Sequence, residues 1–160
     1  MTDERCTILL CFDGSPQAEH AAKIAGRLFP SAHAHVLYVW EPVERIVARY
    51  AALAPFMGEE TGAADADLEA EAGQVIAKGV ELARGGGLDA VPRSEQLRET
   101  VRSTVLEVAD ELGVDVIVTG TRSLRGLREV FSNTLSHALI QHSPMPVLAI
   151  PAAPSEEEPA

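Results

Sequence analysis

Long apolar runs, cysteines and aromatic residues are all scarce in this sequence. No apolar run approaches the roughly 18–20 residues that cross a bilayer, and residues 1–6 lack the pattern of a signal peptide. The two cysteines, Cys6 and Cys11, fall in one expected strand at a spacing that points them to opposite faces, so they cannot bridge each other. We therefore expect a cytoplasmic protein with free thiols and no membrane contact.

Positive charge is also scarce. Thirteen basic residues against twenty-four acidic ones give a net charge of −11, which opposes binding to nucleic acid and to anionic membranes. One segment reverses the sign, because Arg122, Arg125 and Arg128 follow one another with no acid between them.

The common catalytic motifs are absent as well. No GxxxxGK[ST] loop, GxGxxG fingerprint or zinc-type Cys/His spacing occurs. The three glycines at 85–87 follow an expected helix and precede a strand, which is the wrong order for a dinucleotide site. No residue stands out as a general base, so we expect no conventional enzyme and at most a weak ATPase.

Strand-like and helix-like segments alternate along the chain, which predicts a doubly wound α/β domain over residues 1–151, followed by a disordered acidic tail at 152–160. Pro92 places its strand at one edge of the sheet, and the prolines flanking the last strand place that strand at the other edge. The order 3-2-1-4-5, with helices on both faces, satisfies both constraints. The expected strands are 7–12, 33–40, 88–96, 115–120 and 146–151, and the expected helices are 16–28, 64–83, 101–112 and 133–142, with a variable loop and one short helix in 41–60.

In such a sheet a ligand binds outside the carboxyl ends of the strands where the winding reverses, here between the first and fourth strands. Asp13 and Gly120 directly follow those ends, and the arginine segment leads from Gly120 into a helix start near Asn133. Free N–H groups at a helix start favour an anion, whereas a carboxylate repels phosphate. These positions predict a nucleotide with its sugar and base beside Asp13 and its phosphates beside the last helix.

Simpler interpretations stand beside this one. Gly120 is also a common turn residue after a strand, and Ser132 or Asn133 is a common helix cap. Asp13 is equally suited to capping the first helix, and the arginines to a solvated surface or to the acids of a partner.

The residues of the four central segments resemble the universal stress protein family. The matching segments are 8–15 (ILLCFDGS), 36–39 (VLYV), 113–122 (GVDVIVTGTR) and 143–150 (SPMPVLAI), within a resemblance that covers about residues 6–151. The resemblance implies the fold described above, of the adenine nucleotide alpha hydrolase type. It also implies a homodimer formed through the last strand, Val147–Ile150.

One branch of this family binds ATP through glycine, two residues, glycine, nine residues, glycine and then serine or threonine. The spacing is kept here, but the positions read Gly120, Ser123, Asn133 and Thr134, so two of the three glycines are replaced. Of the two replacements, Asn133 is the milder one, because asparagine tolerates left-handed backbone better than serine does. The chain thus lies between the ATP-binding branch and a second branch that lacks the pattern.

The resemblance implies a regulatory module that binds ATP or another adenine nucleotide, with or without magnesium; the alternative is a nucleotide-free dimer acting through protein contacts. Asp13 and Val39 fall on the base and ribose side, and we expect Gly120→Val to fill the crevice while leaving the fold intact. The full candidate set is Cys11, Phe12, Asp13, Val39, Thr119, Gly120, Arg122, Ser123, Asn133, Thr134, Leu135 and Ser136.

Overall fold

A five-stranded, wholly parallel sheet forms the centre of the molecule. The computed structural model describes residues 5–49, 61–121 and 134–154, and all statements below concern these residues. The strand order is β3-β2-β1-β4-β5, which confirms the predicted topology. The strands are β1 (Thr7–Cys11), β2 (His33–Trp40), β3 (Asp89–Gln96), β4 (Val116–Gly120) and β5 (Val147–Ile150).

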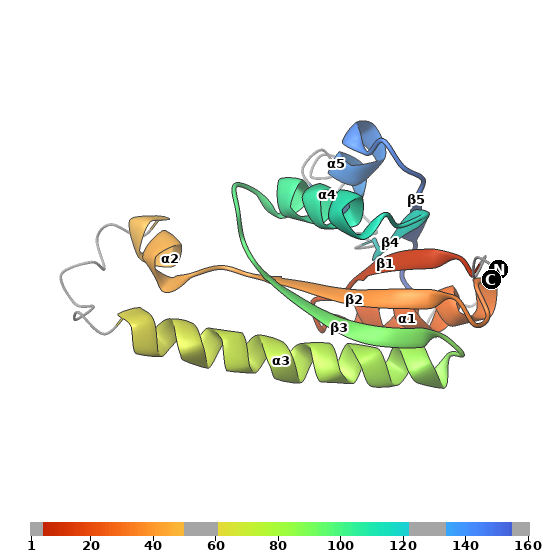
Figure 1. Ribbon diagram of the computed structural model, residues 1–160, viewed down its shortest axis with the longest axis horizontal. Coiled ribbons are helices and arrows are strands. Elements are labelled where there is room, and N and C mark those ends of the chain that lie inside the picture. The colour runs from red at the N-terminus through yellow and green to blue at the C-terminus, as the bar shows by residue number, and fades with distance from the viewer. Residues whose placement is uncertain (1–4, 50–60, 122–133, 155–160) are drawn as a thin grey trace.

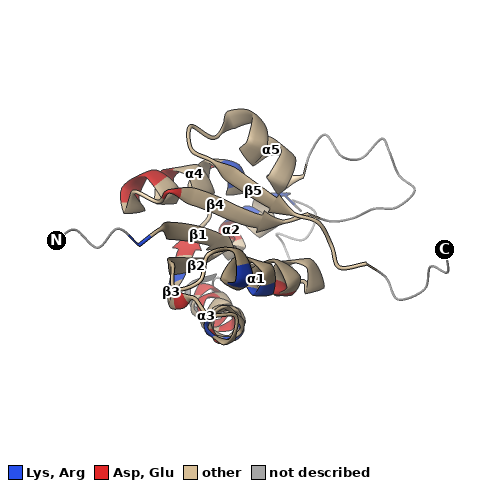
Figure 2. Ribbon diagram, turned by 90° about the vertical axis from the view of Figure 1, so that its right-hand side faces the viewer, with Lys and Arg blue, Asp and Glu red and all other residues tan. Residues whose placement is uncertain are grey.

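Helices cover both faces of this sheet. Figures 1 and 2 show α1 and α3 on one face and α4 and α5 on the other, while the short α2 stands beyond the carboxyl end of β2. This arrangement confirms the doubly wound class. The helices are α1 (Pro16–Leu28), α2 (Val43–Arg49), α3 (Thr61–Gly85), α4 (Val101–Leu112) and α5 (Leu135–His142).

The helix boundaries follow from capping residues. Ser15 caps α1 with Pro16 in its first turn, and Gly113 ends α4 in the left-handed conformation at φ +60°. Two helices differ in their bounds from the expectations. The helix expected at 64–83 extends over 61–85, and α5 is capped by Thr134, so the alternative of a cap at Ser132 or Asn133 is wrong.

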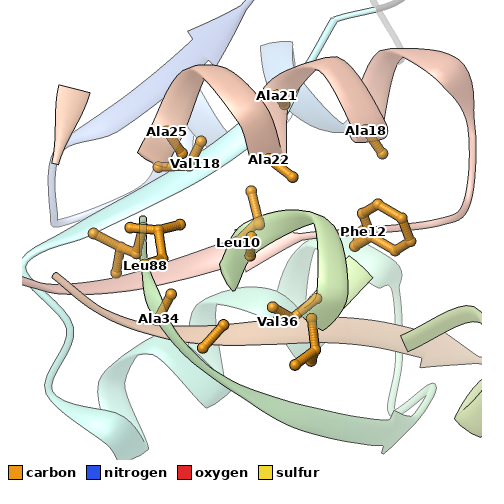
Figure 3. Close-up of a cluster of buried hydrophobic side chains, with 14 of the residues drawn as sticks. Leu10, Phe12, Ala18, Ala21, Ala22, Ala25, Ala34, Val36, Leu88 and Val118 are labelled. Carbon is orange, nitrogen blue, oxygen red and sulfur yellow. The ribbon is translucent and has the colours of Figure 1, made fainter. Parts of the chain in front are cut away.

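Two apolar layers hold the helices to the sheet because side chains alternate along each strand. Ile8 and Leu10 of β1 face α1 and α3, whereas Leu9 faces α4 and α5. Figure 3 shows the first layer, in which alanines of α1 approach Leu10, Phe12 and Val118. Cys6 packs in the first layer and Cys11 in the second, and both thiols are free.

Small residues let α1 and α3 lie close to their neighbours. A Cβ atom at Gly26 of α1 would lie 2.3 Å from the carbonyl oxygen of Gly86, in the turn that follows α3. A Cβ at Gly79 of α3 would lie 2.7 Å from the Phe12 ring. Gly26 and Gly79 are therefore packing requirements of this face.

No helix in the described part of the chain is long and apolar enough to span a membrane. The same residues contain no group of three or more His, Cys, Asp or Glu side chains placed to hold a metal ion.

The glycines of α1 and α3 give a paired stability prediction. Gly26→Ala should lower the free energy of unfolding by about 1–3 kcal/mol, because its Cβ meets backbone that cannot move freely. Gly73→Ala in α3 should raise it by about 0.5–1 kcal/mol, because that position is open and alanine favours helix. Urea unfolding of both variants measures the difference, and equal effects would contradict the close packing of α1 against the turn.

Candidate functional site

A cavity of about 690 Å³ opens at the carboxyl edge of the sheet, beyond the ends of the neighbouring strands β1 and β4. It lies at the predicted switch point, and the turn after β1, the end of β2 and the first turns of α1, α4 and α5 surround it. Ser123, Asn133 and Arg122 of the candidate set lie outside the described residues. The structure brings the other nine candidates to the cavity wall: Cys11, Phe12, Asp13, Val39, Thr119, Gly120, Thr134, Leu135 and Ser136.

The turn from β1 into α1 fixes the position of Asp13. Its Oδ1 accepts a hydrogen bond from the backbone N–H of Ser15 at 3.0 Å, and Gly14 supplies the positive φ of +78° that the turn needs. Ser15 Oγ accepts from the Ala18 N–H at 3.2 Å and is the true cap of α1, so the simple capping role for Asp13 is wrong. The Asp13 carboxylate is thus held at the cavity wall, where it is exposed.

Gly120 has a different role from the one expected. A Cβ built on it would lie 2.8 Å from the carbonyl oxygen of Gln17 and 3.3 Å from the nitrogen of Ala18. The missing side chain therefore makes room for the backbone of α1, and valine at this position would push against α1. The expectation that Gly120→Val leaves the fold intact is wrong for this reason.

The start of α5 forms the opposite wall. Thr134 Oγ1 accepts from the N–H of His137 at 3.4 Å and lies 3.3 Å from Ser136 Oγ. The first turn of α5 contains no acidic residue. Two hydroxyls and the positive end of the helix dipole thus face the cavity, a combination that favours an anionic group.

Apolar side chains from β2 and α4 form a wall of which the sequence analysis predicted only Val39. Leu37 lies beside Val39 on β2, and Val101 and Val105 face the same cavity from α4. The order of the elements gave one signal for this wall. In a parallel sheet the helix that follows a strand begins at the carboxyl edge, so the helix after Gln96 begins at the edge where the cavity lies. This wall is suited to a flat ring such as a nucleobase.

Charged groups are few in this cavity. Among the residues that line it in the described parts of the chain, only Asp13 and Arg102 carry a full charge. Burial, followed by the nearby Asp13 carboxylate, raises the pKa of the Cys11 thiol to about 12. Cys11 therefore stays protonated at neutral pH and is a poor nucleophile.

Fold and cavity together define a doubly wound α/β domain with a ligand site at its switch point. The family model described as "Universal stress protein family" matches residues 5–151, and the chain belongs to that family. A "Universal stress protein in QAH/OAS sulfhydrylase 3'region" from Thermus aquaticus is 32% identical over 151 residues, which cover 90% of this chain and 97% of that protein.

Solved structures share the fold at lower identity. A universal stress protein in complex with cAMP matches with a TM-score of 0.67 at 16% identity, over 93% of this chain and 98% of that one. The universal stress protein from Archaeoglobus fulgidus in complex with dAMP matches with a TM-score of 0.59 at 16% identity, over 91% of this chain and 97% of that one. At these identities the likeness establishes the fold.

Gly120→Ala tests the contact between β4 and α1. Because its Cβ would meet the Gln17 carbonyl, the free energy of unfolding should fall by about 1–3 kcal/mol, measured by urea unfolding. Gly73→Ala, an open site in a helix, is the matched control. A variant as stable as the parent would show that α1 does not approach β4 this closely.

Proposed function

We propose that this protein is a stress-response regulatory module that binds an adenine nucleotide in the cavity between β1 and β4. The observation that carries the proposal is the division of this cavity into an apolar wall on one side and hydroxyls at a helix start on the other. A nucleotide has the same division between base and phosphate. The family relationship and the cAMP and dAMP in relatives support this choice of ligand.

The walls suggest an orientation for the nucleotide. The base would lie against Leu37, Val39 and Val105, with Asp13 accepting a hydrogen bond from the ribose or the base. The phosphates would lie by Thr134 and Ser136 at the start of α5. Gly120 allows α1 and β4 to approach closely beneath the site.

The remaining candidates concern the phosphate side. The phosphates, with or without magnesium, are also assigned from the sequence to Arg122, Ser123 and Asn133. Four further candidates line the cavity wall: Cys11, Phe12, Thr119 and Leu135. We assign no catalytic step to the site. We infer a cytoplasmic location from the two free thiols.

A second candidate function is a nucleotide-free dimer that acts through protein contacts. The observation in its favour is the position of β5, which pairs only with β4 among the described strands and so leaves one edge open. Val147, Leu148 and Ala149 are half-buried in the single chain. Such an edge can pair with a second copy, as the family resemblance implies, and the dimer is compatible with either function.

The decisive experiment is to denature the purified protein and identify any released small molecule by absorbance and mass. We expect an adenine nucleotide, or, for protein purified empty, a rise in melting temperature on adding millimolar AMP or ATP with magnesium. No released nucleotide and no thermal shift, with a dimer seen by sedimentation, would favour the second function and contradict the first.

A pair of valine substitutions localises the binding. Val39→Phe adds bulk to the apolar cavity wall and should weaken AMP binding about tenfold or more, measured by calorimetry. Val91→Phe is the matched control, since Val91 is a half-buried valine on β3 outside the cavity lining. Equal affinities in the two variants would place the nucleotide elsewhere.

A further inference from the structure

Arg102 is a cation in the wall of the cavity for which the described residues provide no counter-charge. It is the second residue of α4 and is half-buried. No residue that the structure describes forms a hydrogen bond or ion pair with it, whereas Arg98, four positions earlier, pairs with Glu95, Glu107 and Glu111. Within a chain of net charge −11, a half-buried guanidinium that faces a cavity and lacks an acid requires an explanation.

The place of Arg102 in its helix makes this feature more unusual. The start of a helix is the positive end of its dipole, where an acid stabilises and a cation destabilises. Among the described helices, α1 and α2 carry Glu19 and Glu44 in their first turns, whereas α3, α4 and α5 have no acid there, and of these three only α4 has an arginine in that turn. The first turn of α4 has no acid and carries Arg102 instead. Such a departure from a local rule is expected where a ligand supplies the missing negative charge.

Neighbouring residues show which side of the cavity Arg102 faces. Val101 lines both this cavity and a smaller one of about 330 Å³, which lies towards Trp40 and Leu97 at the ends of β2 and β3. Arg102 lines only the larger cavity, as does Val105 one turn later. Arg102 therefore lies on the side of α4 that faces the larger cavity, which residues of α5 also line.

Three observations thus coincide: a guanidinium that no described residue pairs with, a helix start whose first turn has no acid, and a place in the lining of the larger cavity alone. The hydroxyls of Thr134 and Ser136 line the same cavity. Asp13 is the other charged group that lines it, and its Oδ1 already accepts the Ser15 N–H. An anion between α4 and α5 would satisfy both helix starts and Arg102.

We propose that Arg102 binds the phosphate of the nucleotide, so that α4 and α5 hold the phosphate from two sides and the site selects nucleoside phosphates over nucleosides. The proposal rests on the proposed function, which it extends to a residue outside the glycine-rich pattern. A planar guanidinium can donate two parallel hydrogen bonds to a phosphate, which gives it both strength and direction. Adenosine, which lacks the phosphate, should gain nothing from Arg102.

The test compares AMP with adenosine on the full chain. Calorimetry should show that Arg102→Gln weakens AMP binding about tenfold or more and changes adenosine binding by less than about twofold. Arg102→Lys should restore part of the AMP affinity, because it returns the charge without the planar fork. Arg27→Gln is the matched control: it removes the same charge from an exposed position in the last turn of α1, and should change neither affinity.

Melting temperatures separate a binding role from a structural one. Ligand-free Arg102→Gln should melt at the same temperature as the parent or higher, because a cation has left the positive end of a helix. An equal loss of AMP and adenosine affinity, or no loss of either, would overturn the role of Arg102 while leaving nucleotide binding in place. A parent protein that binds neither compound would overturn the proposed function together with this inference.

Discussion

The parallel pairing of β1 with β4 is the constraint on which the rest of the molecule depends. Ile8 pairs with Val116 and Leu10 with Val118, which joins segments more than a hundred positions apart in the chain. At the amino end of the pair, the Thr7 N–H donates to Asp115 Oδ2 at 2.7 Å, and the Asp115 N–H donates to the Thr7 carbonyl at 2.8 Å. This fixed register sets where both strands end, and so where the cavity opens.

Three helix starts meet at that edge because each helix follows a parallel strand. Residues of the first turns of α1, α4 and α5 line the same cavity. Acidic side chains are spread over α3 and α4 (Figure 2), yet Asp13 is the only acid that lines the cavity among the described residues. In a chain of net charge −11, the described lining of this cavity thus holds one acid and one guanidinium beside three helix starts, and the positive ends of helix dipoles favour an anion over a cation.

Local patterns in the sequence predicted the fold well. Buried apolar runs such as 7–12 and 115–120 identified the central strands, and Pro92 identified the β3 edge. The exact start of α5 could not be predicted, because Ser132, Asn133 and Thr134 all belong to residue types that cap helices well. The structure selects Thr134. The place of the cavity could be predicted from the residues that directly follow the strands, because the end of a strand fixes the position of the next residues.

What the sequence could not predict depends on how separate elements approach each other. Gly120 was expected to make room for a ligand, but the direction of its missing Cβ depends on the path of α1, which no local pattern contains. Arg102 and Val105 were missed as cavity residues because the face that α4 turns to the cavity is set by its packing on β2 and α5. Helical periodicity identified the buried side of α4 and gave no sign of the side that meets a ligand.

The central claim is that the ends of β1 and β4, with the helix starts around them, form one nucleotide site. Its most direct test is an AMP titration of isotope-labelled protein followed by the backbone amide signals. The amides of Asp13, Gly120 and Ser136 should shift together and saturate at one affinity, while those of His33 and Asp89 at the opposite edge of the sheet stay unchanged. Shifts confined to the opposite edge, or none at millimolar AMP, would contradict it.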